Sequence, residues 1–331
     1  MSKIMDGIFS RAKALNKHIV LPEGLDERVI NAAITVAEKK LAKITIIGDE
    51  KIIAEKSKGQ SLKGVNIINP KTSPKTKEYA KLLYELRKSK GMTEQEAEKT
   101  ALDEVFFGVL MLKNGDADGL VSGAAHSTAD TLRPGLQIVK TAPNASFVSS
   151  YFLMVAPENC EYCKDGAFIY SDCGLMANPT AEELAEIAVI SAKTAELIAH
   201  MQPRVAMLSF STKGSAKHAD IDKVITALNI VKSKAPHLNI DGELQLDAAI
   251  VPKVAKSKAP GSSVAGNANV LIFPDLDAGN IGYKLTERLG GFQAIGPLCQ
   301  GFAKPINDLS RGCNADDIVA AVAITALQTQ L

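Results

Sequence analysis

The sequence predicts an α/β protein with two domains. Its 331 residues are enough for two domains of about 150 residues each. Short runs rich in Val and Ile alternate with longer segments in which apolar residues recur every three or four positions. This alternation is typical of strands and helices built around a parallel sheet. The hydrophobic content of 46% is ample for two packed cores.

The N-terminal part alternates regularly between the two kinds of segment. Its first strand, HIVLPEG, ends in a loop and leads into a helix with period 3.6. A longer helical stretch further on is broken near Gly91. The predicted elements are strands at residues 18–24, 43–49 and 119–123, and helices at 26–41, 126–140 and over most of 74–110.

The same rhythm starts again after residue 145. Two apolar runs, 146–155 and 166–173, are predicted to pair as neighbouring strands. The long helix after them carries a capping box formed by Thr180 and Glu183. Further strands are predicted at residues 204–210, 240–246 and 269–274, and helices at 178–201, 218–234 and 278–291.

Two helices near the C-terminus carry boundary signals of their own. For the helix at 278–291, Asn280 is the predicted N-cap and Gly290 and Gly291 the stop. The last helix, residues 315–331, has a mostly apolar surface. Such a helix must pack against something large, either the first domain or a partner subunit.

The charge pattern argues against nucleic acid and anionic membranes as partners. The net charge is +1, although residues 51–90 hold ten Lys and one Arg against three Glu, a local charge of +8. Such a run is either a solvated helix face or a lobe that attracts a polyanionic small ligand. No apolar run approaches the roughly 20 residues that a membrane span needs.

The cysteines and the N-terminus indicate a cytoplasmic protein. Five Cys without a secretory signal are typical of reduced thiols. The single CEYC motif at 160–163 lacks the second pair that would complete a zinc site, so no metal is expected. The N-terminal residues lack an apolar signal-peptide core and are expected to run straight into the first strand.

Ligands of open α/β sheets bind where strands end and helices begin, and three such junctions are rich in small and hydroxyl residues. In the first, residues 123–125 would let the backbone approach a ligand, and Ser127 and Thr128 offer hydroxyls. Arg133 could bind an anion with two hydrogen bonds. Alternatively, Ser127 or Thr128 caps the helix and Arg133 pairs with a surface carboxylate.

The second junction follows the strand at 204–210. A polar loop with a lysine at a strand end suits phosphate, but it is also ordinary loop chemistry. His218 is interpreted as part of the first turn of the next helix. The loop contains Ser209, Ser211, Thr212, Lys213 and Gly214.

The third junction is NDLSRGCNADDIV, residues 307–319. If Asn314 is the N-cap, Asp316 and Asp317 lie in the first turn, where the helix dipole favours carboxylates. Spacing alone therefore favours a capped helix. Ser310 and Arg311, in the loop before it, put a hydroxyl and a positive charge near those carboxylates. Two further residues of this loop are interpreted without a role in catalysis: Asp308 as a turn residue, and Cys313 as a bystander with no His nearby in the sequence.

Four motifs of the chain resemble phosphate acetyltransferases (phosphotransacetylases), of the phosphate acetyl/butyryltransferase family. The resemblance runs along the whole chain with the motifs in the same order. The motifs are SGAAHSTADTLRPGLQIVKT, SFSTKGSAKH, NVLIFPDLDAGNIGYK and INDLSRGCNADDIVAAVAITALQ.

This resemblance implies a fold and an activity. The activity is reversible acetyl transfer between acetyl phosphate and coenzyme A, a substrate, with no metal or other cofactor. The fold is that of isocitrate and isopropylmalate dehydrogenases: two α/β domains with a cleft between them, in a subunit that usually forms a homodimer. Residues 1–144 and 300–331 would form the first domain, and 145–299 an inserted second domain, which places the third junction at the cleft.

The resemblance also implies roles for single residues. Asp317 would take the proton of the CoA thiol, which leaves Asp316 as the better candidate for capping. Arg311 would stabilise the oxyanion and the departing phosphate, and Ser310 would bond near the reacting groups. Further residues are expected to bind substrate: Arg87 and Arg133 the CoA phosphates, Ser127 and Thr128 the acetyl phosphate, and Arg28 and Arg288 in either a binding or a structural role.

Two other functions compete with this interpretation. An NAD(P)-dependent decarboxylating dehydrogenase would share the general fold, but it needs acidic metal ligands and a nucleotide loop, and neither is evident. A non-catalytic role also exists for similar regions fused behind malic enzymes. Here Ser310, Arg311 and Asp317 are all present, which favours catalysis.

Overall fold

The computed structural model describes residues 2–331, which fold into two compact units. The terminal unit comprises Gly7–Phe147 and Gly301–Gln330. The central unit comprises Val148–Gln300 together with residues 2–6 and the last residue. Each unit has its own sheet, as expected for two α/β domains.

The sheet of the terminal unit is parallel throughout, with the strand order β11-β4-β1-β2-β3. Its strands are short and mostly buried, which explains why they read as continuous apolar runs. The strands are β1 (His18–Leu21), β2 (Lys43–Ile47), β3 (Val65–Ile68), β4 (Gly119–Ser122) and β11 (Ile306–Asp308).

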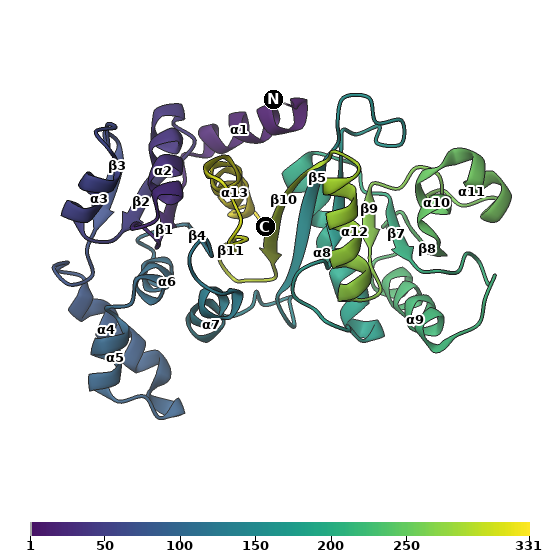
Figure 1. Ribbon diagram of the computed structural model, residues 1–331. Helices are drawn as coiled ribbons and strands as arrows, with labels where there is room; N and C mark the ends of the chain where they lie inside the picture. Colours follow the sequence, from purple (N-terminus) through teal and green to yellow (C-terminus); the bar gives the residue numbers. More distant parts are fainter. Residues whose placement is uncertain (1) are drawn as a thin grey trace. The chain divides into compact units, whose positions relative to one another are not determined.

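Helices cover the two faces of this sheet (Figure 1): α2 packs against α13, and α6 packs against α7. The final helix α13 is buried along most of its length against β1, β4, β11 and α2, so the first domain, one of the two expected partners, receives it. The helices are α1 (Lys3–Leu15), α2 (Glu27–Lys39), α3 (Glu50–Lys56), α4 (Thr76–Arg87) with the 3₁₀ turn η1 (Lys88–Lys90), α5 (Glu94–Thr100), α6 (Glu104–Asn114), α7 (Thr128–Ile138) and α13 (Ala315–Gln328).

The central unit has a mixed sheet with the order β10-β5-β6-β9-β7-β8, whereas the alternation in the sequence is typical of a parallel sheet. The predicted pairing of the first two strands is confirmed, and it is antiparallel. The edge strand β10 also pairs antiparallel, with β5. The strands are β5 (Ser149–Val155), β6 (Ala167–Ser171), β7 (Val205–Leu208), β8 (Ile240–Leu244), β9 (Val270–Ile272) and β10 (Gln293–Gln300).

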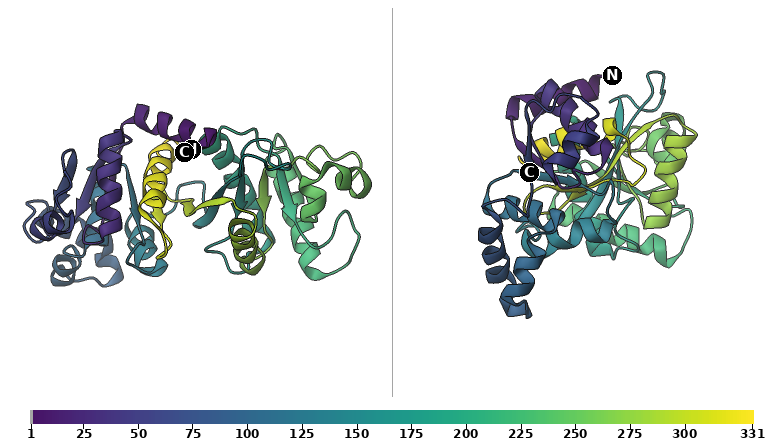
Figure 2. Two further views of the ribbon diagram at one scale, coloured as in Figure 1. Left: turned by 45° about the horizontal axis from the view of Figure 1, so that its top comes forward. Right: turned by 60° about the vertical axis from the view of Figure 1, so that its left-hand side comes forward.

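Helices of the central unit lie against this sheet, and α8 packs against α9. Figure 2 shows the fold from two further directions. On one face, Phe152 of β5 stacks on Tyr283 of α12, with 4.0 Å between ring centroids. The helices are α8 (Ala181–Ala199), α9 (Ala219–Lys234), α10 (Leu246–Ile250), α11 (Pro252–Lys258) and α12 (Leu276–Arg288).

Some predicted boundaries are confirmed and others are wrong. The capping box of Thr180 and Glu183 begins α8 as predicted. Asn280, however, lies inside α12, which Asp275 caps by accepting a bond from the Ala278 amide. The chain also does not run straight into β1, because the helix α1 precedes it. No helix within residues 2–331 is both long and apolar enough to cross a membrane.

Candidate active site in the terminal unit

Three neighbouring strands of the terminal unit, β1, β4 and β11, end at the same edge of the parallel sheet. The loop after β4 and the loop after β11 contain the first and third junctions singled out in the sequence. The segment after β1 links these two loops, because its side chains bond to both. Chain segments up to 285 positions apart therefore form one polar cluster.

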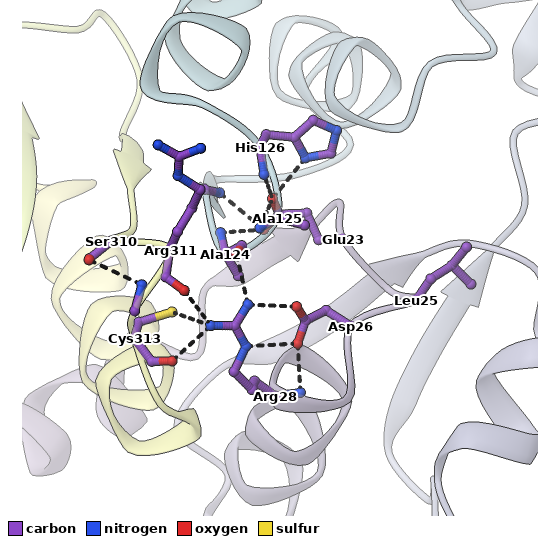
Figure 3. A network of polar contacts seen from close by, with 12 residues as sticks. Glu23, Leu25, Asp26, Arg28, Ala124, Ala125, His126, Ser310, Arg311 and Cys313 are labelled. Carbon is purple, nitrogen blue, oxygen red and sulfur yellow. Dashed lines mark hydrogen bonds and ion pairs between the residues drawn. The ribbon is translucent and has the colours of Figure 1, made fainter.

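Arg28, at the start of α2, holds the three loops together (Figure 3). Its Nη1 donates to the carbonyl oxygens of Arg311, at 2.7 Å, and Cys313, at 3.0 Å. Its Nη2 donates to the carbonyl oxygen of Ala124 at 2.7 Å, and the Asp26 carboxylate accepts from Nη2 and Nε. All five N–H groups of the guanidinium thus have internal partners. For Arg28, a binding role and a structural role were both left open. This arrangement favours the structural role.

Glu23 is a functional candidate that the sequence reasoning missed. It is only 2% exposed, and its carboxylate accepts bonds from four consecutive backbone amides, those of residues 123–126, at 2.8–3.0 Å. Such a row of amides is a ready site for an anion. Here the anion is part of the protein, so these amides are not free for a ligand. A carboxylate directly after a buried strand, in LPEG, was the available signal.

His126 joins Glu23 to a second carboxylate. Its Nδ1 lies 2.8 Å from Glu23 Oε1, and its Nε2 lies 3.9 Å from Glu104 Oε1. Burial lowers the pKa of His126, but the bond to Glu23 and its charge outweigh burial and leave the pKa raised. Burial raises the pKa of Glu104 to about 7, while His126 acts in the opposite direction. Glu104 therefore changes charge near neutral pH.

The start of α13 differs from the prediction in one respect. Asn314 is the N-cap, and it forms a capping box with Asp317: Asn314 Oδ1 accepts from the Asp317 amide, and Asp317 Oδ2 accepts from the Asn314 amide, both at 3.0 Å. The prediction that Asp316 does the capping was wrong. An acid three positions after the N-cap can reach back to its amide, whereas the exposed Asp316 cannot.

Ser310 and Arg311 are exposed in the loop before α13. Ser310 Oγ accepts a bond from the Gly312 amide at 3.3 Å. Figure 3 shows the Arg311 guanidinium pointing away from Arg28, while the Arg311 carbonyl is held by it. Within residues 2–331 no hydrogen bond or ion pair involves the Arg311 guanidinium, which leaves a fixed charge at the edge of the sheet.

The loop after β4 carries the two hydroxyls expected to bind acetyl phosphate. Ser127 is the N-cap of α7: its Oγ accepts from the Asp130 amide and donates to the Asp130 carboxylate. Thr128 is exposed and donates to Asp308 Oδ2 at 2.6 Å. Asp308 is not a turn residue as predicted; it ends β11 and is 2% exposed, because β11 pairs with β4 there.

The remaining predicted binding arginines lie apart from this cluster. Arg133, on α7, is exposed and forms a 3.5 Å ion pair with Asp130, which is the alternative weighed in the sequence. Arg87 ends α4, in the basic stretch of residues 51–90. Arg288 belongs to the central unit, where it lies 3.5 Å from Glu287 and its side chain is 79% exposed.

The second junction also belongs to the central unit and has internal partners. Lys213 pairs with Asp241 and donates to the carbonyl oxygen of Gly242. Ser211 donates to the buried Glu243. His218 is the N-cap of α9. It therefore lies one position before the first turn of the helix, in which it was predicted to lie. This lysine is therefore committed to a carboxylate of its own unit.

The thiols and the potential metal ligands show no reactive cluster. Burial raises the pKa of Cys313 to about 11, against the opposing influence of Arg28, so its thiol stays protonated at neutral pH. Burial likewise raises the pKa of Cys163, in the CEYC motif, to about 12. Among the residues that the structure covers, no group of three or more His, Cys, Asp or Glu is arranged to hold a metal ion.

Comparison with known proteins relates this arrangement to an enzyme family. Residues 3–326 match the family described as phosphate acetyl/butaryl transferase. The chain is 57% identical to a phosphate acetyltransferase of Acetivibrio thermocellus, with 98% of each chain covered, and 47% identical to one of Bacillus subtilis, with 99% of each covered. Among solved structures, it resembles a phosphotransacetylase from Streptococcus pyogenes, at a TM-score of 0.92 and 46% identity, covering 100% of this chain and 99% of that one.

A second solved structure, EutD phosphotransacetylase from Staphylococcus aureus, is similar at a TM-score of 0.90 and 44% identity over 98% of each chain. The agreement extends over whole chains in sequence and in fold. The chain belongs to the phosphate acetyl/butaryl transferase family.

Proposed function

We propose that the chain is a phosphate acetyltransferase, which transfers an acetyl group reversibly between acetyl phosphate and coenzyme A. The main support is the family match over residues 3–326, together with relatives at 47–57% identity that are named phosphate acetyltransferase. The polar cluster at the ends of β1, β4 and β11 supports a site for this chemistry in the terminal unit. Coenzyme A is a substrate here, and we expect no metal or other cofactor to be needed.

In the proposed reaction the CoA sulfur attacks the acetyl carbonyl carbon, and the bond from that carbon to the phosphate oxygen breaks. Asp317 would take the thiol proton, and Arg311 would stabilise the oxyanion and the leaving phosphate. A reference thiol titrates near about 8.5 and a reference Asp near about 3.9, so complete transfer before attack would cost roughly 6 kcal/mol. Transfer concerted with attack avoids that cost. Ser310 would donate its hydroxyl hydrogen to the reacting groups.

Two contacts support this assignment. Only one Asp317 oxygen, Oδ2, accepts a hydrogen bond from the described residues, which leaves Oδ1 for the thiol. The backbone that carries Arg311 is held by Arg28, so the charge has a defined place. Arg28 is thereby proposed as a residue that positions the site. Arg87 and Arg133 remain the proposed partners of the CoA phosphates. The binding or structural role of Arg288 stays a prediction.

A thioester absorbance assay tests the activity. Wild-type protein with CoA and acetyl phosphate, in a buffer containing EDTA, should form thioester, and propionyl and butyryl phosphates in parallel reactions would define the acyl preference. No thioester from any of the three would refute the function. Replacing Arg87 or Arg133 with Ala should raise the KM for CoA. A raised KM for acetyl phosphate instead would assign these side chains to the other substrate.

The role of Asp317 needs two matched controls, because the same carboxylate caps α13. Asp317→Asn should lower turnover at least about 100-fold, the usual range for loss of a general base. Asp316→Asn removes the neighbouring exposed charge and should leave turnover nearly unchanged. Asn314→Ala disrupts the same capping box but keeps the carboxylate. Equal losses of turnover in Asn314→Ala and Asp317→Asn would show a structural role for Asp317 and contradict the base.

We also propose that the protein is a cytoplasmic homodimer. Among the described residues none of the five cysteines is in a disulfide, which supports a reducing compartment. For the dimer, the support is an apolar stripe on α12 and its C-cap: Ile281, Leu285 and Leu289, four positions apart, are 57%, 53% and 81% exposed. Leu285→Asp should yield monomers in light scattering, with Leu331→Asp as an exposed control. Dimers that persist in Leu285→Asp would exclude this surface.

A further inference from the structure

Three buried polar side-chain atoms lie without a hydrogen-bond partner among the described residues: Ser122 Oγ, Thr131 Oγ1 and Asp308 Oδ1. They come from β4, α7 and β11, next to the proposed active site. Ser122 and Asp308 are register partners on adjacent strands, and the Thr131 hydroxyl faces the Asp308 carboxyl without a normal hydrogen bond. A buried polar atom without a partner costs about 1–3 kcal/mol, so an interior built only for stability would avoid three of them.

The Asp308 carboxyl has a single side-chain hydrogen bond of normal geometry. The partner in this bond is an exposed residue. Thr128, the first residue of α7, donates its hydroxyl hydrogen to Asp308 Oδ2 at 2.6 Å, while Thr128 itself is exposed. The neighbouring Gly123 leaves room for this carboxyl, since a side chain there would collide with Asp308 Oδ1. A buried acid thus sets the direction of an exposed hydroxyl at a helix N-terminus, where anions bind favourably.

A hydroxyl carries one hydrogen, so it can satisfy only one acceptor at a time. While Asp308 is ionised, the Thr128 hydrogen is used by the carboxylate, and only lone pairs face outward. Once Asp308 takes up a proton, the carboxylic acid can donate to Thr128 Oγ1. The Thr128 hydrogen then becomes available to an oxygen of a phosphoryl group. No covalent bond other than that of the added proton changes.

We propose that Asp308 is a positioning residue for the phosphoryl group of acetyl phosphate and for phosphate itself, which it serves by taking up a proton and releasing the Thr128 hydroxyl hydrogen. This inference rests on the proposed function and names the group that would recognise its anionic substrate.

The electrostatic surroundings of Asp308 agree with such proton uptake. Burial raises its pKa to about 6, while the hydroxyls of Thr128 and Thr131 and the backbone amide of Leu309 act in the opposite direction. The charge of Glu23, after β1, raises the pKa further. The groups that face it from α7 and β4 are the uncharged Thr128, Thr131 and Ser122. A phosphoryl dianion next to Thr128 would add a second negative charge and favour the protonated acid still more.

The test is the KM for inorganic phosphate in the direction that consumes acetyl-CoA, measured from pH 5.5 to 8. In wild type, KM should rise as pH rises above about 6. Thr128→Val, at an exposed position, should fold and raise KM at low pH about 10-fold or more, since a bond to a charged group is lost. Asp308→Asn should flatten the pH dependence relative to wild type. The ionisation of phosphate itself affects wild type and variants equally, so it cancels when their pH dependences are compared.

Thr131→Val is the matched control, because it removes a buried hydroxyl from the same helix, also next to Asp308, but leaves the Thr128 bond intact. Its KM for phosphate should stay within about twofold of wild type. Should Asp308→Asn fail to fold, the comparison of Thr128→Val with wild type decides alone, and the same pH dependence of KM in both overturns the inference. A wild type without any acetyl transfer would instead refute the proposed function.

Discussion

Replacing Glu23 with Gln tests whether one buried carboxylate organises the site. Glu23 Oε2 accepts from the amides of residues 123 and 124, and Oε1 accepts from those of 125 and 126 and lies 2.8 Å from His126 Nδ1. In Gln, an NH₂ group replaces one of the two oxygens. At least two backbone N–H groups would then face another donor instead of an acceptor.

The expected magnitude follows from that count. A hydrogen bond to a charged group contributes about 1.5–3 kcal/mol, so losing two of them should lower the free energy of unfolding by roughly 3–6 kcal/mol. This is a large share of the about 5–15 kcal/mol that stabilises a typical protein. Turnover should fall as well, because the same loop carries Thr128 and the Ala124 carbonyl that Arg28 holds.

Urea unfolding followed by circular dichroism measures this change, and the matched control is Glu27→Gln. Glu27 forms an exposed ion pair with Lys58, and such pairs contribute at most about 1 kcal/mol. If Glu23→Gln also lost less than about 1 kcal/mol, the amides of residues 123–126 would not depend on this carboxylate. The proposal that Glu23 organises this loop would then be refuted.

Three further predictions concern the same cluster. Arg28→Lys keeps the charge but not the five-donor geometry, and it should lower the free energy of unfolding by about 2 kcal/mol or more; retained stability in urea would argue for a binding role instead. Asn314→Ala should cost about 1 kcal/mol by loss of the N-cap, and an unchanged unfolding midpoint would contradict the capping box. Glu104→Gln should gain stability relative to wild type as pH rises from 4.5 to about 7, because the folded protein holds this proton more tightly than the unfolded chain does. The gain should stay below about 2 kcal/mol, since the side chain keeps contact with water, and a pH-independent difference would rule out titration of Glu104 in this range.

Local sequence predicted the local features of the fold well. The Thr180 and Glu183 box begins α8 as expected, because a cap involves residues only three positions apart. The error at α13 has the same local origin. Asp317 can close a capping box as Glu or Gln would, and recognising that possibility would have assigned the cap to it. Asn280 was predicted as the N-cap of α12, whereas Asp275 caps it, because several polar residues near a helix start can each serve as a cap.

The candidate site could be predicted only in part. Ser310, Arg311 and Asp317 were identified by resemblance to a family whose membership is confirmed, while their roles stay proposals. The sequence left open whether the Arg28 guanidinium bonds within the protein, because its acceptors lie in loops up to 285 positions away. No local pattern reveals a carbonyl oxygen contributed by another loop.

By itself, the sequence determined the α/β class, most helices and strands, and the family to which the chain belongs. Only the tertiary structure decided that Glu23 fills the amides of residues 123–126, and that Asp308 is a buried acid bonded to Thr128. The physical reason is the parallel sheet. Periodicity and caps arise from neighbours along the chain, whereas burial and charge at the strand ends arise when β1, β4 and β11 pair across the sheet.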